Sequence, residues 1–178
     1  MRKTVLPLSQ VYGHLEPGPV VLLTTSRKGR PNVMTMSWHL MIEFEPPLVG
    51  CVVSNRNYSF QAVKATRECA INIPTADLRA AVVGCGNTSG RDLDKFAAFG
   101  LTAAEASRIA PPLIEECYAN LECRVIDVRM VTQYNLFVLE VVRAWSDRSV
   151  KAPRTMHHLG YGRFLLAGRR ITLPSKMR

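Results

Sequence analysis

Short runs of apolar residues separated by turn residues recur along the chain and predict strands. The first run, residues 20–25, is followed by a turn at residues 26–29 and by a partner at residues 31–36, so we expect a hairpin there. Another run, residues 48–53, follows the helix-stopping segment 45–47 and is apolar enough to be covered on both faces. Further strands are expected at residues 69–73, 121–130, 136–144, 164–166 and 171–173.

Helical spacing of apolar residues predicts three helices, at residues 58–66, 75–83 and 91–99. Asn57 or Ser59 can cap the first of these helices, and Thr75 can cap the second. The glycines within residues 84–86 are expected to end the second helix, because glycine tolerates the left-handed conformation that follows a helix. Gly100 is expected to end the third helix for the same reason.

The predicted strands come as hairpin-like pairs with helices inserted between them. The two longest runs form one such pair, with a turn near residues 133–135. This order differs from the regular strand–helix–strand alternation of a Rossmann sheet. We therefore expect a mainly β protein with inserted helices, built on an antiparallel barrel. The 178 residues carry no repeat and no linker, so residues 1–178 are expected to form a single domain.

The composition is that of an ordinary soluble protein, with 47% hydrophobic and 21% charged residues. No apolar run approaches the roughly 20 residues of a membrane helix, and the first ten residues turn polar too early for a secretory signal. The 5 cysteines are an odd number without a C-x-x-C pair, which favours neither a disulfide framework nor a zinc ribbon. We expect buried thiols, a cytoplasmic location and no membrane partner.

The net charge of +9 is unevenly distributed. Residues 1–140 hold 14 basic and 13 acidic side chains, whereas residues 141–178 hold 9 basic ones and only Asp147. Such a basic C-terminal region could meet nucleic acid, an anionic membrane, an acidic protein or a phosphate-bearing small molecule. Because the chain shows no zinc finger, RNP-type strand or helix-turn-helix pattern, we expect no nucleic acid partner.

Small hydroxyl and amide residues cluster at the predicted strand ends and beside Lys95. They are Asn32, Thr35 and Ser37, then Ser54, Asn55, Asn57 and Ser59, then Thr88 and Ser89. Taken singly, each fits an ordinary turn or cap. Together with backbone N–H groups at a helix start, the cluster can form a cradle for the phosphate of a mononucleotide.

Other motifs exclude several kinds of chemistry. Ser89 stands where the third glycine of G-x-G-x-x-G belongs, so residues 84–90 do not match a dinucleotide-binding loop. The 4 histidines lack the arrangement of a metal site, and the elbow of a serine hydrolase is missing, so we expect no metal and no catalytic triad. Trp38 could stack on a ring system or lie in the core, and Cys85 could be reactive or a buried structural thiol.

Six segments in a fixed order are NVMTMSW (residues 32–38), EPPL (45–48), NYS (57–59), INIP (71–74), CGNTSGRDLDKF (85–96) and ECYANLEC (116–123). With these segments the chain resembles the flavin reductase-like, flavoredoxin-type family over about residues 15–168. The resemblance implies an FMN-binding split barrel, a Greek-key β-barrel that pairs as a homodimer, with the flavin near the subunit interface.

The resemblance also implies flavin contacts at matching positions. They are Asn32, Thr35, Met36, Ser37 and Trp38 along the flavin, Ser54 and Ser59 at its phosphate end, Ser89 and Lys95 as further anion contacts, and Phe164 as a C-terminal aromatic. Lys95 offers the positive charge that a phosphate needs. Where relatives often carry a histidine before Leu136, this chain has Tyr134 and Asn135, a change that could alter redox potential or donor preference.

The main functional hypothesis is an FMN-dependent oxidoreductase. It would take electrons from NADH, NADPH or a redox partner protein and pass them to a flavin, a metal complex or another protein. Because the flavin ring accepts hydride itself, the missing catalytic triad is no objection. The basic C-terminal region could hold the phosphates of the nicotinamide nucleotide. The alternatives are a non-catalytic, FMN-holding electron carrier or sensor without a nicotinamide site, and a colourless nucleic-acid module with salt-dependent binding.

Overall fold

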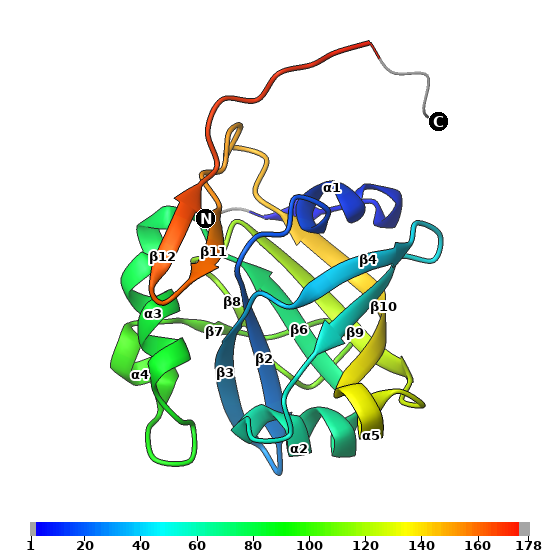
Figure 1. Cartoon of the computed structure of the whole chain (residues 1–178), viewed down its shortest axis with the longest axis vertical. Coiled ribbons are helices and arrows are strands. Elements are labelled where there is room, and N and C mark those ends of the chain that lie inside the picture. Colours follow the sequence, from blue (N-terminus) through cyan, green and yellow to red (C-terminus); the bar gives the residue numbers. More distant parts are fainter. Residues whose placement is uncertain (1–2, 175–178) are drawn as a thin grey trace.

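The computed structural model describes residues 3–174, and its centre is an antiparallel eight-stranded sheet (Figure 1). The strands of this sheet are β1 Thr4–Val5, β2 Val21–Arg27, β3 Arg30–Met36, β4 His39–Glu43, β5 Leu48–Val52, β6 Glu68–Ile73, β9 Ala119–Asp127 and β10 Leu136–Ser146. They follow one another in the order β3-β2-β6-β9-β10-β5-β4, and β1 pairs with β10. The sheet curls around an apolar core, which confirms the predicted mainly β fold.

Two small sheets and several helices complete the fold. The small sheets are β7 Ala103–Ala104 with β8 Leu113–Ile114, and β11 Met156–Gly160 with β12 Arg163–Leu166. The helices are α1 Tyr12–Leu15, α2 Tyr58–Thr66, α3 Arg79–Asn87, α4 Lys95–Phe99 and α5 Val131–Tyr134, with 3-10 turns at Leu8–Gln10 and Ala76–Leu78. Helix α2 has the predicted bounds. Between residues 3 and 174, no helix combines the length and the apolar composition needed to cross a bilayer.

The first predicted hairpin is confirmed. Strands β2 and β3 pair along their whole length, and Lys28 and Gly29 form the tip with φ angles of 53° and 73°. A two-residue turn with positive φ at both positions matches the right-handed twist of paired strands. The pairing places Arg27 directly opposite Arg30 at the end of the hairpin.

Apolar clusters cover both faces of β2. Val21 and Leu23 belong to the core inside the curled sheet. Leu22, between them in sequence, belongs to a second cluster with Val82 of α3 and Phe96 of α4. Burying an aliphatic or aromatic side chain of this size contributes about 1.5–3 kcal/mol to stability. The second cluster therefore holds α3, α4 and the loop between them against the outer face of the β2–β3 hairpin.

The structure contains a strand that the sequence pattern does not predict. Strand β4 pairs with β5 and ends the order of the large sheet. Apolar residues alternate along it, but Leu40 and Ile42 on one side of the strand are 54% and 47% exposed. Because these apolar side chains face outward in this chain, the strand lacks the usual polar outer face.

Helix α3 continues beyond the glycines that were expected to end it. It passes through Gly84 and Gly86 to Asn87, so that expectation is wrong. A Cβ atom added to Gly84 would lie 2.3 Å from a ring carbon of Phe99. Gly84 therefore serves the close packing of α4 against α3 and does not terminate the helix.

Helix α4 is shorter than predicted. It begins at Lys95 because Asp94 caps it, accepting hydrogen bonds from the backbone N–H groups of Phe96 and Ala97 at 3.0 and 3.3 Å. Its C-terminal end agrees with the prediction, since Gly100 has a φ of 63°. The segment before Asp94 is a loop, so the expectation of a helix from residue 91 is wrong.

The C-terminal part differs from the prediction in two ways. Residues 171–173 form no strand, and the chain from residue 167 extends away from the body (Figure 1). Ile171 and Leu173 are about 70% exposed there, and within residues 3–174 neither of them pairs with a strand. The expected strand at residues 164–166 is present as β12, paired with the unpredicted β11.

The two long strands β9 and β10 pair antiparallel as expected. Their connection is not a tight turn, because it contains α5 and then Asn135 in the left-handed conformation with a φ of 56°. All five cysteines are buried and free, which confirms the prediction of buried thiols.

A buried carboxylate fixes the loop between β7 and β8 to the sheet. Glu122 of β9 is fully buried and accepts hydrogen bonds from the backbone N–H and the hydroxyl of Ser107, the backbone N–H of Arg108 and the indole N–H of Trp145. The four distances lie between 2.6 and 3.1 Å. The protein thus supplies four donors to one buried charge.

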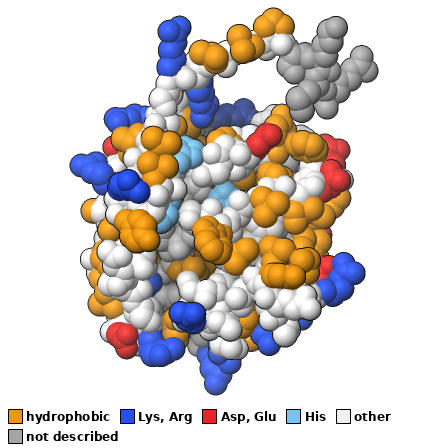
Figure 2. Space-filling view, viewed as in Figure 1, with side chains coloured by type: hydrophobic (Ala, Val, Ile, Leu, Met, Phe, Trp, Pro, Cys, Tyr) orange, Lys and Arg blue, Asp and Glu red, His pale blue; other side chains and the backbone are white. Residues whose placement is uncertain are grey.

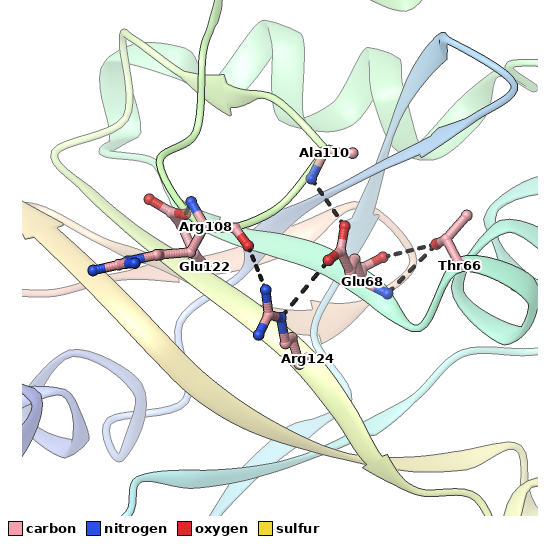
Figure 3. A network of polar contacts seen from close by, with 6 residues as sticks. All are labelled: Thr66, Glu68, Arg108, Ala110, Glu122 and Arg124. Carbon is pink, nitrogen blue, oxygen red and sulfur yellow. Dashed lines mark hydrogen bonds and ion pairs between the residues drawn. The ribbon is translucent and has the colours of Figure 1, made fainter.

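A second carboxylate, near the surface, supports the same loop. Glu68 accepts a hydrogen bond from the backbone N–H of Ala110 at 2.9 Å and lies 3.7 Å from Nε of Arg124. Arg124 in turn donates to the carbonyl of Arg108 at 2.9 Å, and the network spans β6, β9 and the loop (Figure 3). This side of the barrel is closed by polar contacts within the chain.

Candidate functional site

A polar cavity of about 220 Å³ lies where β3, α2, α3 and α4 meet. Its lining residues are Asn32, Met34 and Thr35 of β3, Arg56, Asn57, Tyr58 and Ser59 at the start of α2, Cys85 and Gly86 of α3, Thr88, Ser89 and Gly90 of the following loop, and Lys95 of α4. None of these lining residues is acidic. The cavity therefore offers donors and positive charge, which suits an anion.

Lys95 is the buried charge of this polar cavity, with only 4% of its surface exposed. Its Nζ donates to the carbonyl of Cys85 at 2.7 Å, and within residues 3–174 it forms no ion pair. Burial lowers the pKa of Lys95, while the neighbouring Cys85 opposes this shift. An ammonium group has three donors, and buried charges are normally paired. An anion in the cavity would complete the surroundings of Lys95.

The opposite wall of the polar cavity is held by contacts between β3, α2 and the loop after α3. The side-chain amide of Asn32 donates to the hydroxyl of Ser59 at 2.8 Å, and both residues are buried. A Cβ atom at Gly90 would lie 1.8 Å from Oδ1 of Asn32, so no larger residue fits at this approach. Arg30 donates to the carbonyl of Gly90 at 3.4 Å. These contacts within the chain fix the position of β3 relative to α2 and to the loop after α3.

An aromatic cavity of about 290 Å³ continues from the polar one. It is lined by Val20 and Ser37, by Val82, Val83 and Asn87 of α3, and by His158, Gly162 and Phe164 of the β11–β12 hairpin, and it shares Thr35 and Gly86 with the polar cavity. The rings of His158 and Phe164 lie 5.3 Å apart. The two cavities form one cleft with a cationic end at Lys95 and an aromatic end at Phe164.

This cleft fits a molecule that carries a phosphate at one end and a flat ring system at the other. The phosphate would meet Lys95 and the hydroxyls of Ser59 and Ser89. The ring system would lie along Thr35 toward Phe164. FMN has this chemical outline, and the residues present fit it.

Most of the site residues named from the sequence lie in the cleft. Asn32, Thr35, Ser59, Ser89 and Lys95 line the polar cavity, and Thr35, Ser37 and Phe164 line the aromatic one. Three expected residues lie elsewhere in this chain. Met36 is 4% exposed in the core, Trp38 is 71% exposed and lines neither cavity, and the Ser54 hydroxyl accepts a hydrogen bond from the backbone of Arg56.

Several lining residues of the cleft were not named as site residues from the sequence, and four of them have side chains or contacts that matter for a ligand. They are Arg56, Tyr58, Gly90 and His158. Arg56 and Tyr58 adjoin Asn57 and Ser59, so the polar segment that was singled out from the sequence already includes their positions. Gly90 and His158 enter the site through contacts between distant segments, which a local pattern does not contain.

Cys85 faces the polar cavity as a thiol. Burial raises its pKa to about 11, although Lys95 opposes this shift. At neutral pH the thiolate needed for nucleophilic attack is therefore scarce. Of the two interpretations of Cys85, the structure favours the buried structural thiol.

Comparison with known proteins identifies relatives over most of the chain. A sequence profile described as the flavin reductase like domain matches residues 13–164. The uncharacterized protein YddH of Escherichia coli (strain K12) is 33% identical over 172 residues, which cover 89% of this chain and 91% of that protein. A 4-nitrophenol 4-monooxygenase/4-nitrocatechol 2-monooxygenase reductase component of Rhodococcus opacus is 31% identical over 134 residues, or 75% and 68% of the two chains.

A solved structure also matches nearly the whole chain. It is an FMN-binding domain of a flavin reductases-like enzyme from Shewanella baltica OS155, with a TM-score of 0.92 and 26% sequence identity. The match covers 97% of this chain and 98% of that one. The split-barrel architecture expected from the sequence is therefore confirmed.

Proposed function

Because the chain belongs to the flavin reductase-like family, we propose that it binds FMN in the cleft and transfers electrons from NADH or NADPH to an acceptor. The observation that carries this proposal is the buried ammonium of Lys95, which lines a polar cavity without a carboxylate partner among residues 3–174. The relatives support it, since one is a monooxygenase reductase component and another is an FMN-binding domain.

Each wall of the cleft has a separate task in this proposal. Lys95, Ser59 and Ser89 hold the phosphate, and Asn32 keeps the Ser59 hydroxyl in place through its hydrogen bond. Thr35 orients the middle of the ligand, because its own hydroxyl ties β3 to the carbonyl of Val82. These contacts bind and position the ligand. The nearby thiol of Cys85 takes no part in them.

Bound FMN supplies the hydride-accepting position at N5 of its ring, so the protein needs no general base for electron transfer. Phe164 and His158 lie where they can limit which face of a ring is open to a donor. The β11–β12 hairpin that carries them forms one wall of the aromatic end of the cleft.

An exposed apolar face supports the homodimer that the resemblance implies. Trp38, Leu40, Ile42 and Phe44 alternate along β4 and its flanks, and each is 47–71% exposed. Tyr12 packs edge-on against Phe44 at 5.0 Å. Figure 2 shows hydrophobic side chains gathered where β4 crosses the molecule. Contiguous apolar surface of this kind typically marks a protein interface, and we propose that a second copy of the chain covers it.

Substitution on this face tests the dimer. Changing both Leu40 and Ile42 to Glu places two charges in the proposed interface, so we expect a monomer by light scattering. The matched control is Leu93→Glu, because Leu93 is also an exposed apolar residue but lies in the loop before α4. A mass equal to that of the unchanged protein in the double variant would exclude this face as the interface.

The proposed function is tested by colour and by anaerobic reduction. We expect the purified protein to bind FMN at micromolar concentration and the bound flavin to be bleached by NADH or NADPH. Retained FMN without bleaching by either nucleotide would instead indicate the electron carrier without a nicotinamide site. A protein that takes up no FMN would contradict the whole proposal.

A further inference from the structure

A third cavity, of about 330 Å³, lies beside the polar cavity on the side away from the aromatic end. Four of its lining residues are arginines, namely Arg27, Arg30, Arg56 and Arg91, and we call it the arginine pocket. It shares Asn32, Arg56, Asn57 and Tyr58 with the polar cavity, whereas it shares no lining residue with the aromatic one. The cleft therefore has three parts in a row.

The arginines come from three separate segments of the chain. Arg27 and Arg30 face each other at the end of the β2–β3 hairpin, Arg56 precedes α2, and Arg91 precedes α4. None of the four forms an ion pair in the part of the chain that the structure describes, and no acidic residue is among those that line the pocket. All four arginines are exposed to solvent, and together they make the pocket a region of positive potential that attracts an anion.

Contacts inside the chain position two of the four arginines. Arg30 donates to the carbonyl of Gly90, and the guanidinium of Arg91 lies 6.0 Å from the centre of the Tyr58 ring. Guanidinium groups bind phosphate oxygens with two parallel hydrogen bonds, and they also stack on flat rings. The pocket thus combines charge for a phosphate with a partly exposed aromatic side chain for a base.

We propose that the arginine pocket binds the ADP moiety of a dinucleotide. The proposal rests on the proposed function, because an FMN phosphate held at Lys95 would place the next phosphate at the shared wall formed by Arg56. In FAD the second phosphate is joined directly to the flavin phosphate, which matches the direct contact of the two cavities. The ADP moiety also occurs in NADH and NADPH, so this one chemistry has two sources.

The test compares FAD with FMN, using flavin fluorescence to measure affinity for the flavin-free protein. Arg27→Gln together with Arg91→Gln removes two charges that line only the arginine pocket. We expect the affinity for FAD to fall about tenfold or more and the affinity for FMN to change less than about twofold. Lys64→Gln is the matched control, because Lys64 is an exposed cation on α2 that lines neither cavity.

A second arm separates the two sources of the ADP moiety. ADP-ribose is titrated into the FMN-loaded protein, with and without the two substitutions. Binding that depends on the arginines supports the nicotinamide nucleotide as source, and an arginine-dependent FAD affinity supports the flavin dinucleotide. If neither FAD nor ADP-ribose responds to the substitutions while FMN binds normally, the inference is overturned and the proposed function stands. Failure of FMN itself to bind overturns both.

Discussion

Glu122 and Lys95 are both buried charged residues, but they differ in the hydrogen-bond partners that the chain gives them. Glu122 accepts four hydrogen bonds from groups of its own chain, including the indole N–H of Trp145. Lys95 donates one hydrogen bond, to the carbonyl of Cys85, and faces a cavity. A buried charged group whose hydrogen-bond partners all come from its own chain stabilises the fold. A buried charged group that lacks such partners and faces a cavity indicates a ligand site.

The surroundings of the two charges explain this difference. Glu122 lies on β9 beneath a loop whose backbone N–H groups turn toward it, so folding supplies its partners. Lys95 begins a five-residue helix whose cap, Asp94, is occupied by the helix N–H groups. The carboxylate nearest in sequence caps the helix, and within residues 3–174 no carboxylate pairs with Lys95.

The largest effect is expected at Glu122. Glu122→Gln places amide hydrogens among groups that all donate, leaving buried donors unpaired. We expect the free energy of unfolding to fall by about 3 kcal/mol in urea titrations followed by circular dichroism. The control is Glu105→Gln, an exposed carboxylate of the same loop. A loss below about 0.5 kcal/mol at Glu122 would show that its four hydrogen bonds are not essential to the fold.

The same substitution should leave the ligand site intact. Glu122 lines neither the polar nor the aromatic cavity, so FMN affinity of the folded Glu122→Gln protein is expected to equal that of the unchanged protein. A large loss of FMN affinity in Glu122→Gln without a loss of stability would show that Glu122 serves ligand binding and not the fold.

Lys95→Met should produce the opposite pattern. Loss of the ammonium removes a charge-assisted contact to phosphate, which is worth about 1.5–3 kcal/mol, or about 10- to 150-fold in FMN affinity. The stability of the flavin-free protein should stay equal or rise, because methionine fills similar space without an unpaired charge. Riboflavin, which lacks the phosphate, is the control ligand, and its affinity should not change. Equal losses for FMN and riboflavin would place the phosphate away from Lys95.

Elements with a complete local signal are predictable from this sequence. The hairpin at Lys28 and Gly29, the end of α4 at Gly100 and helix α2 all depend on residues within a few positions of one another. Elements that depend on distant partners are not. Gly84 has the signal of a helix end, but Phe99 packs against it and the helix continues.

The site divides in the same way. Lys95 and the polar residues around Ser59 stand out in the sequence because their side-chain chemistry suits a phosphate. The need for glycine at position 90 depends on Asn32 of a strand far away in sequence. Trp38 turns outward although the preceding residue, Ser37, lines the cleft. Side-chain chemistry is local, whereas the direction in which a side chain points is decided by packing.

The smallest expected effect is a pH dependence that separates ligand binding from stability at Lys95. Burial lowers the pKa of Lys95 below its ordinary value of 10.5, and a bound phosphate favours the charged form. As pH rises through this lowered pKa, FMN affinity should fall, by at most about tenfold per pH unit for one titrating group. The flavin-free protein should instead gain stability between the lowered pKa and 10.5, because there the unfolded chain binds more protons than the folded one.

Two controls connect this pH dependence to Lys95. In Lys95→Arg the cation does not titrate below pH 12, so both trends should disappear. Riboflavin shares the ring of FMN but lacks the phosphate, and its affinity should show only the dependence that the ring itself causes. If FMN and riboflavin lose affinity in parallel, the titrating group acts on the ring and not on the phosphate. If FMN affinity falls with pH while the stability of the flavin-free protein rises, the ammonium of Lys95, unlike the carboxylate of Glu122, obtains its charged partner from a ligand.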